Sequence, residues 1–81
     1  MIIEILTLTV DGLAVKYYIM FGKDRRKFSF QPTLKNKSAP TFTVLVDEGK
    51  FVTDQPVDSN LLDQAVKKIR EVLSDDIFDR F

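Results

Sequence analysis

The Asp11-Gly12 pair constrains the fold more than any other feature, because it separates two runs of β-forming residues. A two-residue type I′ turn needs positive φ at both central residues, and Asp-Gly is among the pairs that adopt it most readily. The pair therefore predicts a β-hairpin over residues 2–21, in which Val10 faces Leu13 across the turn.

The polarity of the two faces supports this register. Side chains alternate between the faces of a sheet, so a slip of one residue would exchange the faces completely. In the predicted register one face carries a single polar residue, Glu4. The other members of that face are apolar: Ile2, Leu6, Leu8, Val10, Leu13, Val15, Tyr17, Ile19 and Phe21. We expect the core on this side of the hairpin.

The remaining β-like segments are shorter and also alternate. Residues 27–31 predict a strand with Phe28 and Phe30 on one side, and Pro32 either ends it or restricts it to a sheet edge. Residues 41–46 predict another strand, and a glycine-containing turn leads from it to a short partner at 50–53.

After residue 56 the apolar period changes from 2 to 3.6, which indicates an amphipathic helix. Asp58 is a suitable N-cap, and Val57 with Leu62 has the spacing of a hydrophobic staple. The C-terminal end is poorly marked, and the apolar stripe can continue into residues 77–81. The stripe consists of Leu61, Leu62, Ala65, Val66, Ile69, Val72 and Leu73.

These patterns predict one α+β domain over residues 1–81. Its antiparallel sheet should have about four to five strands, with the β-hairpin 2–21 first and one C-terminal helix packed on one face. The order of the strands beyond the first hairpin stays open.

The residue inventory leaves little room for catalysis or metal binding. The chain has no histidine and no cysteine, and its three glycines are isolated turn residues rather than a phosphate-binding loop. We predict no catalytic residues, no cofactor and no metal site, and therefore no enzyme. A carboxylate-held Mg²⁺ enzyme is the least favoured third hypothesis, because only carboxylates remain as ligands.

Global charge points to no particular partner. Twelve basic side chains balance twelve acidic ones, so nothing attracts the whole chain to nucleic acid or to an anionic membrane. No apolar run approaches the length of a membrane span, and the apolar N-terminal segment has neither a basic leader nor an uninterrupted core. The absence of cysteine fits a reducing compartment, so we expect a cytoplasmic protein.

One basic segment suggests an alternative function. Residues 23–37 carry six basic side chains and one acidic one, next to two phenylalanines. Basic groups beside exposed aromatic rings can bind single-stranded nucleic acid, but a solvated turn beside core phenylalanines explains the segment better. The candidate nucleic-acid residues are Lys23, Arg25, Arg26, Lys27, Phe28, Lys35 and Lys37.

The main functional hypothesis concerns uncovered apolar surface. A single helix covers only one face of a small sheet, and the second face of the hairpin is apolar far from the turn. Either the C-terminal segment folds back over this surface, or another chain binds there, most simply as a homodimer. We therefore predict a non-catalytic interaction and assembly module that self-associates or binds a protein partner. Its predicted partner-binding residues are Ile3, Ile5, Tyr18, Met20, Ile77, Phe78 and Phe81.

Overall fold

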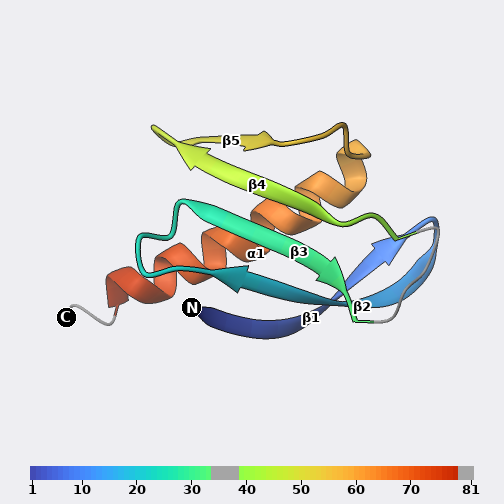
Figure 1. Ribbon diagram of the computed structural model, residues 1–81, viewed down its shortest axis with the longest axis horizontal. Helices are drawn as coiled ribbons and strands as arrows, with labels where there is room; N and C mark the ends of the chain where they lie inside the picture. The colour runs from blue at the N-terminus through green and yellow to red at the C-terminus, as the bar shows by residue number, and fades with distance from the viewer. Residues whose placement is uncertain (34–38, 79–81) are drawn as a thin grey trace.

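The computed structural model describes residues 1–33 and 39–78, with side chains described as far as Ser74. It contains a single five-stranded antiparallel sheet and a C-terminal helix, as Figure 1 shows. The strands are β1 (Ile2–Val10), β2 (Leu13–Phe21), β3 (Lys27–Pro32), β4 (Phe42–Asp47) and β5 (Lys50–Thr53), and the helix is α1 (Ser59–Phe78). The predicted α+β class and architecture are confirmed.

The first hairpin has the predicted turn and register. Asp11 and Gly12 have φ values of 51° and 79°, as a type I′ turn requires. Val10 pairs with Leu13, and the ladder continues without a bulge to the pairing of Ile2 with Phe21. The turn residues and the alternation of polarity therefore specify the same structure.

The sheet is a simple meander, in the order β1-β2-β3-β4-β5. The β4–β5 hairpin repeats the turn chemistry of the first one, because Glu48 and Gly49 also have positive φ, 49° and 79°. Pro32 is the last residue of β3, so its missing N–H does not interrupt the ladder.

Helix α1 begins immediately after Asp58, as the capping pattern predicts. The Leu62 N–H donates to the Asp58 carbonyl oxygen at 2.9 Å, which closes the first helical turn. The helix continues to Phe78, so the two acidic residues 75–76 lie within it rather than at its C-terminus. Figure 1 shows α1 behind the sheet, crossing the strands obliquely.

The core lies between α1 and one face of the sheet. Tyr17, Ile19, Phe28, Phe30 and Ile69 are all 0% exposed. The rings of Phe30 and Phe42 stack with centroids 4.9 Å apart. The preferred interpretation of the two strand-β3 phenylalanines, as core residues beside a charged turn, is therefore confirmed.

Two members of the predicted core face are not buried. Ile2 and Leu13 are 37% and 60% exposed, although their backbone positions place them on that face. Each is the first residue of its strand and lies at the periphery of the core, where the faces of the sheet are open to solvent. Glu4, the polar member of the same face, reaches α1 instead, with its Oε2 3.6 Å from Lys68 Nζ.

Candidate protein-binding surface

The face of the sheet opposite α1 presents the four predicted hairpin residues together. We call Ile3, Ile5, Tyr18 and Met20 the apolar patch. Ile3 pairs with Met20, and Ile5 pairs with Tyr18, so the four form two adjacent cross-strand rows. Ile3, Ile5 and Tyr18 are 58%, 62% and 37% exposed, and Met20 is half-buried. The register thus groups large apolar side chains on a face that the helix does not cover.

The three C-terminal members of the predicted surface contribute no side-chain evidence. Ile77 and Phe78 are the last residues of α1, and their side chains lie outside the described part of the structure. Phe81 lies outside the described residues altogether.

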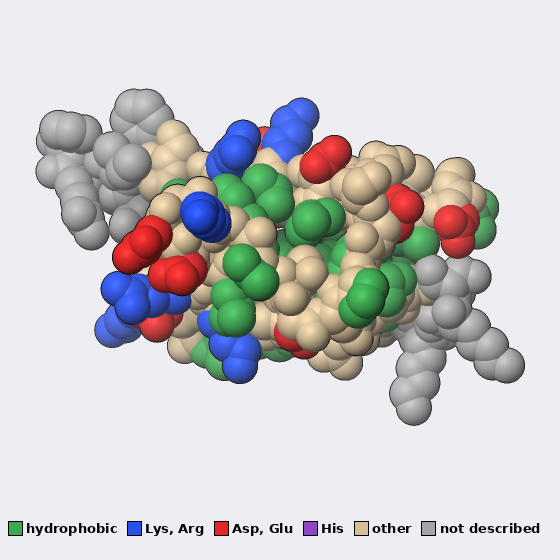
Figure 2. All heavy atoms as spheres, turned by 90° about the horizontal axis from the view of Figure 1, so that it is seen from above, with side chains coloured by type: hydrophobic (Ala, Val, Ile, Leu, Met, Phe, Trp, Pro, Cys, Tyr) green, Lys and Arg blue, Asp and Glu red, His purple; other side chains and the backbone are tan. Residues whose placement is uncertain are grey.

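A second exposed apolar pair lies on the same face, and the sequence reasoning did not single it out. Leu45 of β4 pairs with Val52 of β5, and they are 42% and 52% exposed. Ser29 and Thr43 separate this pair from the apolar patch. Figure 2, which looks onto the β5 side of the molecule, shows hydrophobic side chains between charged groups there. The alternation of polarity along β4 could have identified Leu45 from the sequence, because it places this side chain on the face away from the core.

Strand β1 forms one edge of the sheet, and α1 occupies part of that edge. The Gln64 side chain bonds both backbone groups of Thr9: the Thr9 N–H donates to Oε1, and Nε2 donates to the Thr9 carbonyl oxygen, each at 2.8 Å. The amide thus replaces a neighbouring strand at this position. No local pattern could reveal this contact, because the two residues are 55 positions apart.

The direction of the other β1 backbone groups follows from the ladder. In an antiparallel pair, hydrogen-bonded and non-hydrogen-bonded residue pairs alternate. The Lys16 carbonyl accepts from Thr33 on the β3 side, so Lys16 and its partner Thr7 form a non-hydrogen-bonded pair. Thr7, Ile5 and Ile3 share the parity of Thr9 and therefore direct their N–H and C=O groups out of the sheet.

A groove of about 400 Å³ runs between the β1 edge and α1. Leu6, Thr7 and Leu8 form its strand side. Its helix side carries Lys67, Lys68 and Glu71 in addition to Gln64. The groove therefore places two cations and one carboxylate beside an open strand edge.

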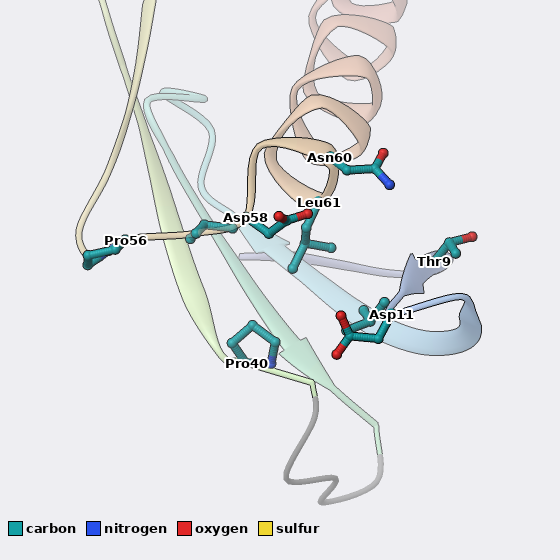
Figure 3. A pocket seen from close by; sticks show the side chains of 9 residues that line it. Thr9, Asp11, Pro40, Pro56, Asp58, Asn60 and Leu61 are labelled. Carbon is teal, nitrogen blue, oxygen red and sulfur yellow. The ribbon is translucent and has the colours of Figure 1, made fainter.

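A smaller pocket of about 180 Å³ lies between the tip of the first hairpin, Pro40 and the start of α1 (Figure 3). Asp11 and Asp58 contribute carboxylates from two of its sides. These acids oppose the binding of an anion at the helix N-terminus. Within residues 1–33 and 39–78, no group of three or more potential metal ligands is found. The pocket therefore has no evident ligand class.

The basic segment does not combine charge with accessible aromatic rings. Lys23, Arg26 and Lys27 are exposed in and after the β2–β3 turn, and the Arg25 guanidinium lies 5.9 Å from the Phe21 ring centroid. Phe28 is completely buried, so it has no free face on which a base could stack. Phe28 therefore offers no accessible ring in this structure, and its role as a nucleic-acid contact stays a prediction. Lys35 and Lys37 lie outside the described residues.

Within the described residues, α1 lacks the apolar length that crossing a bilayer would require. No protein family, curated protein or solved structure is significantly similar to this chain.

Proposed function

We propose that this domain is a non-catalytic assembly module that associates with a second copy of itself through the apolar patch. The observation that carries the proposal is the exposure of Ile3, Ile5 and Tyr18 side by side on the uncovered face. Isolated apolar side chains are normal on protein surfaces, whereas contiguous ones usually mark an interface.

The small size of the domain also favours association, because burial between two copies adds to a small core. A chain of 81 residues buries a modest fraction of its surface, and this one has no cysteine to form a disulfide. Burying a large aliphatic side chain contributes roughly 1.5–3 kcal/mol when it starts fully exposed. Two half-exposed isoleucines from each copy would therefore provide several kcal/mol before the cost of association.

The patch also lacks the features that normally keep a sheet face monomeric. Apart from Lys16 near the turn, no charged side chain of β1 or β2 lies on the uncovered face. A charge within the patch would have opposed its burial, since desolvating an unpaired charge is costly. The nearest acid on β1, Glu4, belongs to the opposite face and pairs with α1.

The test is the molar mass by light scattering, measured over a concentration series with Ile5→Lys and the control Ala14→Lys. Both residues lie on the same exposed face of the first hairpin, but Ala14 lies near the turn, away from the patch. We expect the wild type and the control to shift toward a dimer with rising concentration, and Ile5→Lys to remain monomeric. A wild type that stays monomeric at high micromolar concentration would refute the proposal.

The same samples discriminate against nucleic-acid binding through the basic segment. An oligonucleotide that bound at low salt and was released by added salt would favour that alternative, provided that Arg25→Ala/Arg26→Ala abolished the binding. The burial of the phenylalanines beside that segment supports the assembly proposal over this one.

A further inference from the structure

We infer that two copies join edge to edge, with β1 of one copy pairing antiparallel to β1 of the other about a two-fold axis at Ile5. This rests on the proposed function, since it specifies the geometry of the same self-association. The result would be one continuous sheet of two five-stranded halves. Three observations support this pairing. They are the outward backbone groups of the β1 edge, the contact of Gln64 with Thr9, and the side chains that each register would bring together.

The free edge offers a short, defined set of hydrogen-bonding groups. Ile3, Ile5 and Thr7 direct N–H and C=O groups outward, and no described residue bonds them. Unpaired groups of this kind are a template for strand addition, and proteins usually protect them with charge, proline or a covering element. Among the residues that the structure describes, Thr9 alone has its outward groups occupied, by the Gln64 side chain.

The position of Gln64 limits the possible registers. A pairing centred on Leu6 or Thr7 would bring Thr9 into the interface, where its N–H and C=O are already occupied by the Gln64 amide. A pairing centred on Ile5 stops short of that position. It matches Ile5 with Ile5 and Ile3 with Thr7, so all three free residues form hydrogen-bonded pairs.

Charge excludes the neighbouring alternative. A pairing centred on Glu4 would place the two Glu4 carboxylates directly opposite each other, and like charges in that position are destabilising. Centring on Ile5 instead places Glu4 of each copy opposite Leu6 of the other. Leu6 lines the groove bordered by Lys67, Lys68 and Glu71, whose charges sum to +1, so each Glu4 carboxylate would approach a net positive group of the partner copy as well as its own Lys68.

The same register joins the two apolar patches. Paired residues in an antiparallel sheet point to the same face, so Ile5 of one copy would lie against Ile5 of the other on the uncovered side. Ile5 is 62% exposed in the single chain, the highest value among the patch residues. The two-fold axis therefore lies at the patch residue whose side chain has the largest exposed fraction to bury.

Single-cysteine variants test the register directly, because the native chain contains no cysteine. Residues in a hydrogen-bonded antiparallel pair have Cα atoms about 5.5 Å apart, within the range that a disulfide spans. Ile5→Cys should therefore form a covalent dimer rapidly under mild oxidation. Ile3→Cys is the matched control: its side chain is 58% exposed, but the two copies of that residue would be offset by about 14 Å, four residues at about 3.4 Å each.

Two further measurements test the edge pairing if a cysteine disturbs association. Ile5→Pro removes an outward N–H without removing a bond to β2, and it should weaken dimerisation by about tenfold or more, whereas Ile5→Val should not. Amide exchange at Ile3, Ile5 and Thr7 should slow as protein concentration rises. Far-UV circular dichroism of each variant confirms that the fold is retained.

The outcomes separate this inference from the proposed function. If the wild type dimerises but Ile5→Cys cross-links no faster than Ile3→Cys, and Ile5→Pro dimerises normally, the edge pairing is wrong while self-association stands. Preferential cross-linking of Tyr18→Cys would point to face-to-face packing and would also overturn the edge pairing. A strictly monomeric wild type would overturn both.

Discussion

The contact between Gln64 and Thr9 permits a quantitative test of how the helix and the first strand are joined. Gln64→Ala removes two hydrogen bonds of 2.8 Å, and each such bond contributes about 0.5–1.5 kcal/mol net. Alanine returns a few tenths of a kcal/mol through its better helix propensity, on a scale that spans about 0.7 kcal/mol. We therefore expect the free energy of unfolding to fall by about 1–2.5 kcal/mol, or a melting temperature lower by about 4–20 °C for a domain of this size.

The assay is urea denaturation at low protein concentration, combined with site-resolved amide exchange. In the wild type, the Thr9 amide should exchange more slowly than that of Thr7, which has the same outward direction but no partner among the described residues. In Gln64→Ala the two amides should exchange at similar rates. The control Asp63→Ala changes an exposed neighbour on the same helix and should leave the Thr9 amide protected. A Gln64→Ala protein with unchanged stability and a protected Thr9 amide would refute the claim that this side chain closes the strand edge.

Three other substitutions have expected outcomes. Ile69→Ala should lower the free energy of unfolding in urea by about 2–5 kcal/mol, because it empties a completely buried site beneath the sheet; a loss below 1 kcal/mol would contradict the packing described. Glu48→Asn should raise that free energy by about 0.5–1 kcal/mol, since asparagine tolerates the positive φ of the β4–β5 turn better than glutamate does; a lower denaturation midpoint would count against it. Burial raises the pKa of the Tyr17 phenol above its ordinary value of 10.0, so above about pH 10 the unfolded chain loses a proton that the folded chain retains, and stability should fall as pH rises. Tyr17→Phe should reduce that alkaline loss in pH-dependent melting curves, while costing about 1 kcal/mol at neutral pH through the lost 2.8 Å bond to the Pro40 carbonyl; identical alkaline curves would exclude Tyr17 as the group responsible.

Features encoded by neighbouring residues were predictable from the sequence. The type I′ turn at Asp11 and Gly12 requires a backbone conformation that few residue pairs favour, and period-two polarity then leaves only one register. The start of α1 after Asp58 follows from a capping pattern that spans one helical turn. The grouping of Ile3, Ile5, Tyr18 and Met20 on one face followed from the register alone.

Features that depend on distant residues were not predictable in the same way. The order of the strands beyond the first hairpin is one such feature, because the alternation of polarity within a strand carries no information about which strand lies beside it. In the sequence Glu4 interrupts an otherwise apolar face, whereas in the structure its carboxylate pairs with Lys68 of α1. The Gln64 contact has no sequence signature either, because an exposed glutamine on a helix normally indicates only solvent. Exposure of Ile2 and Leu13 reflects the finite extent of the core, which periodicity cannot report.

The pairing of the final helix with the first strand has a consequence during synthesis on the ribosome. Every strand pairing within the meander joins strands that are consecutive in the chain, so the sheet can assemble progressively as the chain emerges. The side chain that shields Thr9 is made more than fifty residues later. Throughout that interval all outward N–H and C=O groups of the nascent first strand are unprotected. Several ribosomes on one messenger RNA would bring identical strand edges together before Gln64 has been synthesised.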